Sequence, residues 1–211
     1  NPELDPAANT EADLGIRYER DRWLFQAKVF YADLDGFIYQ EKTVTNRQTY
    51  VNIDAHIFGG DLKAEADIIG GLSVKGGVAY QRGRKDSQPQ NNDDEDLGQI
   101  APLKSMLATQ YEGQTSDVDY FGTIEWVHSA ATERVDEDAG EQQLDAYDII
   151  NVRVGCRFRS MSIHAGVDNL FDRLYTVANS YEWDVIGGAG ATPAIVNEPG
   201  RFIYASVGFT W

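Results

Sequence analysis

Apolar and polar residues alternate along most of this chain. In the final stretch, GRFIYASVGFTW (200–211), every second residue counted back from Trp211 to Ile203 is apolar. Side chains alternate between two faces along a β-strand, so this stretch predicts a strand with one apolar and one mixed face. The same alternation fits a soluble antiparallel sheet packed on a core, or a membrane barrel with its apolar face in lipid. One strand does not distinguish the two.

Similar runs recur along the chain, and segments with a helical period are hard to find. The apolar parity reverses after Phe58-Gly59-Gly60, which we interpret as a β-bulge within one strand. With the final strand, the runs predict an all-β fold of about nine strands. The other eight runs are 10–19, 23–32, 50–68, 72–81, 101–111, 118–127, 149–158 and 162–171.

The connections between these runs alternate in length, which indicates an up-and-down sheet with short turns at one end and long loops at the other. Such segregation is typical of outer-membrane barrels, as are charges on one strand face and aromatic residues near the strand ends. We therefore favour an antiparallel up-and-down transmembrane β-barrel over a soluble β-sandwich. The short connections are 19–22, 69–71 and 159–161, the intermediate one is 113–117, and the long ones are 42–48, 84–99, 128–145 and about 176–199.

Composition narrows the function classes. The 211 residues include 34 acidic and 18 basic ones, a formal charge of −16, which argues against nucleic acid as a partner. A single cysteine rules out an internal disulfide and disfavours a cysteine metal site. No stretch approaches the roughly 20 consecutive apolar residues of a membrane helix. The opening NPELDPAANT has neither Met nor a signal sequence, so we expect a mature product or a fragment.

Two segments near the end carry a family resemblance. VDNLFDRLY (167–175) followed by EPGRFIYASVGFTW (198–211) resembles the C-terminal end of TonB-dependent outer-membrane receptors. The opening NPELDPAANTEADLGIRYERDRWLFQAKVFYADLDGFI (1–38) also resembles a segment of that family, with Ala7 and Ala8 where a Pro-Glu or Pro-Lys pair is common.

The resemblance implies a barrel of about 22 strands around a plugged lumen. Residues 1–211 would be its last nine strands, and the plug domain and the N-terminal strands would be absent from this chain. An odd number of strands does not close in the usual bacterial way, and each unpaired backbone group in lipid costs several kcal/mol. We therefore expect the N-terminal barrel and plug portion of the same receptor to complete the structure.

The function that the resemblance implies is energy-coupled uptake of a scarce nutrient across the bacterial outer membrane. The ligand would be a ferric siderophore, haem, cobalamin, copper or a glycan, and the TonB complex would act through the absent plug. VNEPGR (196–201) also resembles the end of the family's copper-receptor branch. G-x-S-x-G, P-loop and H-E-x-x-H motifs are missing, so we expect neither an enzyme nor a cofactor. A passive porin or structural barrel, and a soluble β-sandwich binding module, are the alternatives.

Candidate ligand contacts lie in the predicted outer loops. The loop NSYEWDVIGGAGATPAI (179–195) contains Tyr181, Trp183 and Asp184, and loops of this kind fold over the ligand in the family; interfacial anchoring is the alternative. The acidic stretches NNDDEDLG (91–98) and ERVDEDAGE (133–141) suit a cell-surface position. There they would be solvated loops, or would hold divalent ions between lipopolysaccharide phosphates.

Four polar residues are expected to face the lumen: Asp54, His56, Glu125 and Arg153. Asp54 and His56 are two residues apart on one strand face, a spacing that allows two metal ligands. We favour the simpler interpretation, a lumenal histidine hydrogen-bonded to barrel carboxylates, and expect no metal site.

The terminal strand has two expected roles. Its apolar residues would face outer-membrane lipid, with Trp211 at the interface. The resemblance further implies that Phe209 and Trp211 form the signal recognised by the barrel assembly machinery.

Overall fold

The computed structural model describes residues 4–42, 48–88, 93–137, 141–178, 180–182 and 194–210. Apart from a small two-stranded pair, the strands of these residues form one nine-stranded sheet. The described residues contain no helix whose length and hydropathy would let it span a membrane.

Every strand of the large sheet pairs antiparallel with its neighbour, in the order β1-β2-β3-β4-β5-β6-β7-β8-β11. This confirms the predicted all-β meander. The strands are β1 (Ala8–Arg20), β2 (Trp23–Lys42), β3 (Gln48–Ile69), β4 (Leu72–Lys85), β5 (Lys104–Gln114), β6 (Val118–Ser129), β7 (Tyr147–Phe158), β8 (Met161–Asp168) and β11 (Phe202–Phe209). The separate pair consists of β9 (Tyr181–Glu182) and β10 (Ala194–Ile195).

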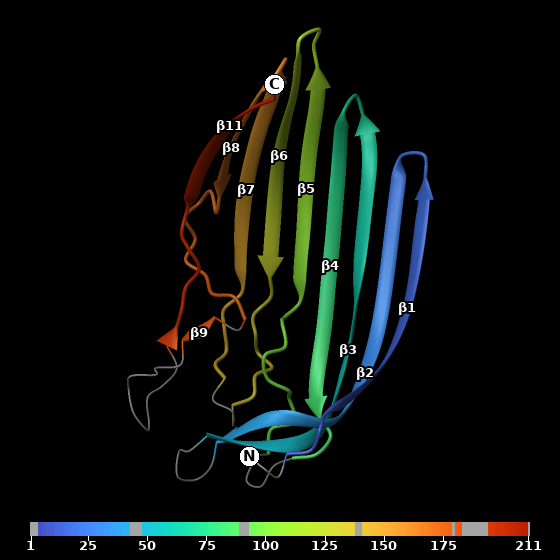
Figure 1. Cartoon of the computed structure of the whole chain (residues 1–211), viewed down its shortest axis with the longest axis vertical. Coiled ribbons are helices and arrows are strands. Elements are labelled where there is room, and N and C mark those ends of the chain that lie inside the picture. Colours follow the sequence, from blue (N-terminus) through green and yellow to red (C-terminus); the bar gives the residue numbers. More distant parts are fainter. Residues whose placement is uncertain are drawn as a thin grey trace.

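The connections segregate by length as predicted (Figure 1). The turns at the upper end of the view are short, and Asp21, Gly70, Gly71 and Arg159 adopt positive φ angles in them. The long connections, 86–103, 130–146 and 169–201, all leave the opposite end of the sheet. Large loops therefore gather at one rim only, which we call the loop end; the other rim is the turn end.

The predicted bulge at Phe58-Gly59-Gly60 is wrong. The register runs through these residues without a shift, so the odd positions of β3 keep facing one side. Glycine is needed there for close approach, because a Cβ on Gly59 would lie 2.4 Å from the carbonyl oxygen of Tyr80. The reversal in the hydrophobic pattern has another cause. Near the loop end the odd residues of β3 pack against loop residues and are apolar, whereas nearer the turn end the odd residues lie on a polar surface and are charged.

The bulge in this part of the sheet lies in β2. Asp35 and Gly36 together stand opposite Asp54, because the register shifts between Leu34 and Phe37. Gly36 has a φ of 62°, and its amide donates to Oδ1 of Asp54 over 3.1 Å. The bulge re-aims the ends of β2 and β3, which bend across the loop end in Figure 1.

A small apolar core lies beneath this bent hairpin. Tyr39, Ile53, Ala55 and Leu97 are buried together. Leu97 reaches them because residues 95–97 pair alongside the end of β4, where the Lys85 amide donates to the Glu95 carbonyl and the Leu97 amide to the Gly83 carbonyl. The first long loop is thus packed onto the sheet.

Candidate functional site

The register divides the side chains of the large sheet into two faces of different chemistry. One face is apolar, with Leu14 at 74%, Ile16 at 63% and Val207 at 58% exposed in the isolated chain. Over the strand segments between its aromatic residues this face carries no Asp, Glu, Lys or Arg in the described strands. A broad exposed apolar face of this kind requires an apolar surrounding. We call it the apolar face, and its opposite the polar face.

Aromatic residues border the apolar face at both ends. On β2, Trp23 and Tyr31 lie at opposite borders, and 31 − 23 = 8 positions separate them. At about 3.3 Å per residue and a tilt near 40°, that spacing corresponds to a height of about 20 Å, close to the apolar band of a membrane barrel. The turn-end row contains Tyr18, Trp23, Tyr111, Tyr120, Phe158 and Phe209; the loop-end row contains Tyr31, Phe58, Tyr80 and Trp126.

Two of the four residues expected to share a polar face lie on the opposite one. His56 pairs with Arg84 on the apolar-face side, just beyond the loop-end aromatic row, and its ring stacks on Tyr31 and Phe58. Asp54, two residues earlier, shares that side and caps the bulge of β2. The expectation was wrong because it relied on the parity reversal in β3, and no reversal of the strand occurs.

Glu125 and Arg153 do lie on the polar face, where they belong to a connected network. Oε1 of Glu125 accepts from Nδ2 of Asn151 over 2.8 Å and from Nη2 of Arg153 over 3.4 Å. Arg153 also lies 3.5 Å from Oδ1 of Asp168, and the Asn169 amide donates to Oδ1 of Asn151 over 3.0 Å. The network ties β6, β7 and β8 together and presents fixed charges to whatever occupies this side.

The loop end contains a buried ion pair that sequence reasoning missed. Nζ of Lys85 lies 2.8 Å from Oδ2 of Asp136, and both side chains are fully buried. The Tyr39 hydroxyl donates to the same oxygen over 2.6 Å, and Lys85 lies 5.0 Å from the centroid of the Tyr39 ring. This cluster joins β4, the bent hairpin and the loop 130–146. No sequence signal separated Asp136 from the other acidic residues of VDEDAG.

A second carboxylate holds the same loop. Oε2 of Glu141 accepts from the Asp136 amide over 2.8 Å, and Oε1 accepts from the Gln99 amide over 3.0 Å. Burial raises the pKa of Glu141 above its ordinary value, against the opposing effect of these two hydrogen bonds. Glu141 therefore connects the loops 86–103 and 130–146, and the connection depends on its charge state.

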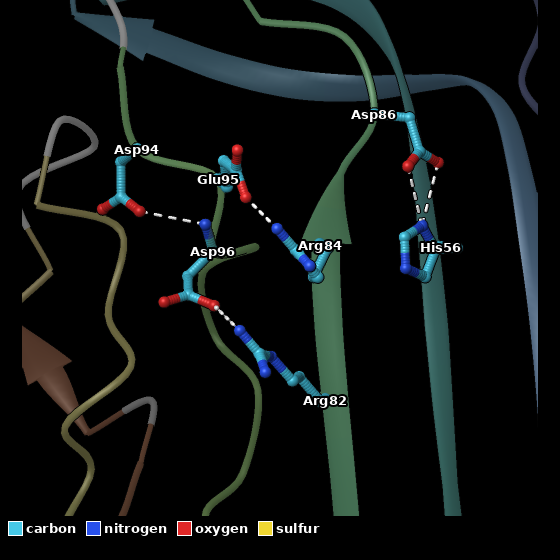
Figure 2. A network of polar contacts seen from close by, with 7 residues as sticks. All are labelled: His56, Arg82, Arg84, Asp86, Asp94, Glu95 and Asp96. Atoms are coloured by element: carbon cyan, nitrogen blue, oxygen red, sulfur yellow. Dashed lines mark hydrogen bonds and ion pairs between the residues drawn. The ribbon is translucent and has the colours of Figure 1, made fainter.

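At the loop end, beyond the aromatic row and on the same side of the sheet as the apolar face, basic side chains pair with carboxylates (Figure 2). Nδ1 of His56 lies 2.8 Å from Oδ1 of Asp86, and Nη2 of Arg82 lies 3.5 Å from Oδ1 of Asp96. Arg84 pairs with Glu95, and the Asp96 amide donates to Oδ1 of Asp94 over 2.9 Å. The arginines come from β4, and their carboxylate partners come from the loop beside it.

The segment VDNLFDRLY owes its pattern to a turn. Asn169 has a φ of 52°, and its side chain bonds both the amide and the carbonyl of Arg173, each over 2.8 Å. Oδ1 of Asp172 accepts from the amide of Arg201 over 2.7 Å, next to Gly200. The two segments that carry the family resemblance thus bind each other and close the long connection 169–201.

The remaining candidate residues are placed only in part. Tyr181 lies in β9, whose backbone pairs with β10. Trp183, Asp184 and Trp211 lie outside the described residues. Phe209 is the last residue of β11, on the apolar face, with 65% of its surface exposed. Among the described residues, no three His, Cys, Asp or Glu side chains converge as metal ligands would.

The apolar face, its aromatic borders and the loops gathered at one rim are typical of a segment of an outer-membrane β-barrel wall. Sequence comparison identifies the family. The TonB dependent receptor-like β-barrel family matches residues 1–170. The chain belongs to this family, whose members are outer-membrane receptors. The resemblance in the sequence is thereby confirmed.

Individual relatives are transport receptors of metals and siderophores. Over 131 residues the chain is 33% identical to the ferric enterobactin receptor of Pseudomonas aeruginosa, a match to 57% of this chain and 17% of that protein. The copper transporter OprC superposes with a TM-score of 0.87 and 27% identity, covering all of this chain and 32% of that one. The ferric yersiniabactin uptake receptor FyuA of Yersinia pestis superposes with a TM-score of 0.76 and 17% identity, covering 96% of this chain and 30% of that one. The chain therefore spans about a third of the length of these solved relatives.

Proposed function

We propose that this chain is the C-terminal wall of a receptor that takes up a scarce nutrient across the bacterial outer membrane with energy from the TonB complex. The complete barrel has about 22 strands, of which residues 1–211 supply the last nine. Its N-terminal strands pair with the free edges of β1 and β11, and its plug domain fills the lumen on the polar face.

The observation that carries this proposal is the chemical division of the sheet. The apolar face has the height and the aromatic borders of a lipid-facing surface, whereas Glu125, Arg153 and Asp168 stand on the opposite face. A lumen filled by a protein plug needs such fixed polar partners on its wall. A soluble β-sandwich would instead cover the apolar face with a second layer.

For the ligand we propose a ferric siderophore or another metal complex. The relatives support this class, since one is a ferric enterobactin receptor, another is a copper transporter and a third is a ferric yersiniabactin uptake receptor. Siderophore complexes are larger than a bare ion and need contacts from several loops. We propose that Tyr181, Trp183 and Asp184 contribute such contacts from the loop after β8.

The terminal strand supports a role in assembly. We propose that Phe209 and Trp211 are recognised by the barrel assembly machinery, because β11 ends with Phe209 outward on the apolar face. Removal of Trp211 should lower the amount of receptor that reaches the outer membrane, measured by fractionation, while Trp211→Phe should preserve it.

Uptake by the full-length receptor tests the transport proposal. Cells lacking their own siderophore and copper receptors would carry it, and accumulation of ⁵⁵Fe-loaded catecholate siderophores and of ⁶⁴Cu would be followed with and without TonB. We expect saturable accumulation of one of these substrates that disappears without TonB. Equal accumulation in both strains would identify a passive porin and overturn the proposal.

A further inference from the structure

Three segments of the loop end pack together into one body. In Figure 1 the ends of β2 and β3 bend across this end as a hairpin, made of residues 37–42 and 48–53. The hairpin is joined to the loops 86–103 and 130–146 by buried apolar contacts and by the Tyr39 hydroxyl. We call the hairpin and the described residues of these two loops the rim cap.

The rim cap is anchored on the polar-face side of the sheet. Ala55 of β3 stands opposite Lys85 of β4 in the register, and both lie on the side that carries the ion pair of Glu65 with Lys75 further along the strands. Leu97 packs beside Ala55, and Lys85 pairs with a carboxylate of the second loop. Both loops therefore turn inward over the polar face, where they would cover part of the lumen.

Close packing joins the two loops to the strand beneath them. A Cβ on Gly83 would lie 2.9 Å from the Cβ of Leu97, so the first loop rests directly on the backbone of β4. A Cβ on Gly98 would lie 3.2 Å from the Cβ of Asp136, so the two loops also contact each other. Close-packed atoms transmit a displacement to their neighbours, and the loops and β4 therefore behave as one body.

Two carboxylates bind backbone amides from one loop to the other. Oδ2 of Asp94 accepts from the Glu137 amide over 3.0 Å, and Oε1 of Glu141 accepts from the Gln99 amide over 3.0 Å. The buried ion pair described above adds a third link, and its complete burial comes from the chain's own residues. Lifting the rim cap would break all of these contacts together.

The connection 169–201 is held differently at its base. The ion pair of Asp172 with Arg201 spans 4.0 Å, and about half of each side chain is exposed. Exposed ion pairs contribute little to stability, whereas separating a fully buried pair is costly. The contacts of the loop end are thus strong on the side of β2, β3 and β4 and weaker on the side of β8 and β11.

We propose that the rim cap is a fixed cover over the β2–β4 side of the outer mouth of the barrel and stays docked throughout transport. The substrate then enters on the other side, past the connection 169–201 and the absent N-terminal strands. The route of the substrate rests on the function proposed above. The docking of the rim cap rests on the contacts within this chain.

Hydrogen exchange of the full-length receptor without substrate tests the docking. The amides of residues 95–100 and 130–137 should exchange as slowly as those of β4. Gly83→Ala should speed exchange in residues 95–100 about fivefold or more, because its methyl group displaces Leu97. Gly77→Ala is the matched control on the same face of β4, since its nearest neighbours would be 3.5 Å away. Equal exchange in the two variants, or wild-type loop amides that exchange as fast as an unfolded segment, would overturn the proposal.

A disulfide between positions 84 and 96 tests whether the rim cap moves during transport. Arg84 and Asp96 form an isolated antiparallel bridge with backbone hydrogen bonds on both sides of it. In such a non-hydrogen-bonded pair the Cα atoms lie about 4.5 Å apart, a separation that a disulfide can span. The double variant Arg84→Cys/Asp96→Cys therefore fastens the first loop to β4 from outside the lumen, and mass spectrometry of the linked peptides confirms the bond.

The fastened receptor should accumulate ⁵⁵Fe-loaded catecholate siderophore or ⁶⁴Cu at the same rate when oxidised and when reduced. The two single-cysteine variants are the controls for the lost side chains. Uptake that stops on oxidation and returns on reduction would overturn the proposal, because the rim cap would then have to lift. If the wild type accumulates neither probe, the proposed function fails, and the exchange measurement still decides whether the rim cap is docked.

Discussion

Nζ of Lys85 lies 2.8 Å from Oδ2 of Asp136, and neither side chain has exposed surface. The two residues belong to different elements, the end of β4 and the loop 130–146, so the pair holds the loop onto the sheet. Removing one member takes away the opposite charge that lies 2.8 Å from the other in a fully buried site. Breaking a buried pair in this way costs about 3–5 kcal/mol.

We therefore predict that Asp136→Ala releases the loop 130–146 while the sheet stays folded. Hydrogen exchange of the full-length receptor should show lost protection in residues 130–137 and unchanged protection in β6 and β7. The double variant Lys85→Met/Asp136→Leu should restore protection, because apolar residues of similar size fill the site without a charge. Unchanged exchange in Asp136→Ala would show that other contacts hold the loop.

Acidification is predicted to stabilise the docked state of the loop that Glu141 holds. Burial raises the pKa of this carboxyl in the folded loop above its value in an undocked loop. The docked state therefore binds the proton more tightly, so this contribution is present at low pH and is lost as pH rises through the raised pKa. Exchange of the Asp136 and Gln99 amides, corrected for intrinsic rates, should slow as the pH falls from 7 toward 5. The variant Glu141→Gln should lack this pH dependence, and an identical dependence in both proteins would contradict the assignment.

Two glycines of the polar face are predicted to be irreplaceable. A Cβ on Gly166 would lie 2.4 Å from Cζ of Tyr204, and one on Gly155 would lie 2.4 Å from Cε1 of Phe121. These rings cover bare backbone, and Gly166→Ala should lower the free energy of unfolding by about 1–3 kcal/mol through overpacking. Gly122→Ala is the matched control, since its nearest neighbour would be Val154 Cγ1 at 3.9 Å. Urea unfolding of the receptor in lipid vesicles measures both, and equal loss in the two variants would refute the packing argument.

The architecture followed from the sequence because each lipid-facing strand alternates over a long run. The strand count and the segregation of loop lengths needed only the period-two pattern and the positions of the polar segments. Where one face of a strand is buried by a loop at one end and lies on a polar surface at the other, the same pattern predicts the facing of its residues wrongly. In β3, Ile53 and Ala55 pack under loop residues, whereas Glu65 on the same side of the strand pairs with Lys75 on the polar face. Parity alone therefore predicted a bulge that does not exist.

The candidate site depended on contacts that no periodicity encodes. His56 was assigned to the wrong face through that error in β3. Asp136 meets Lys85 across 51 residues, and one carboxylate among several in an acidic loop carries no mark of burial. The motif residues Asn169 and Asp172 were recognised as a pattern, but their role is to bond the backbone at Arg173 and Arg201.

That role leads to a prediction for Asp172. Its Oδ1 accepts from the Arg201 amide, which fixes where β11 begins. Asp172→Ala should cost about 1 kcal/mol or less, because the side chain is half exposed, and should increase proteolytic cleavage within the connection 169–201. Asp172→Asn keeps an acceptor at the same place and should remain as resistant as the wild type. If both variants are cleaved alike, the charge rather than the backbone hydrogen bond orders the segment.

The two faces of β11 allow the lipid assignment itself to be tested with neighbouring residues. Val207 lies on the apolar face and is 58% exposed in the isolated chain, whereas Ser206 stands opposite His164 on the polar face. If the apolar face meets hydrocarbon, Val207→Arg should destabilise the receptor in a bilayer by about 2–4 kcal/mol near the midplane. Ser206→Arg should cost much less, because the polar face already holds charges such as Arg153. Folding in vesicles, followed by the gel shift of the heated and unheated receptor, compares the two. A larger penalty for Ser206→Arg would mean that the faces are reversed.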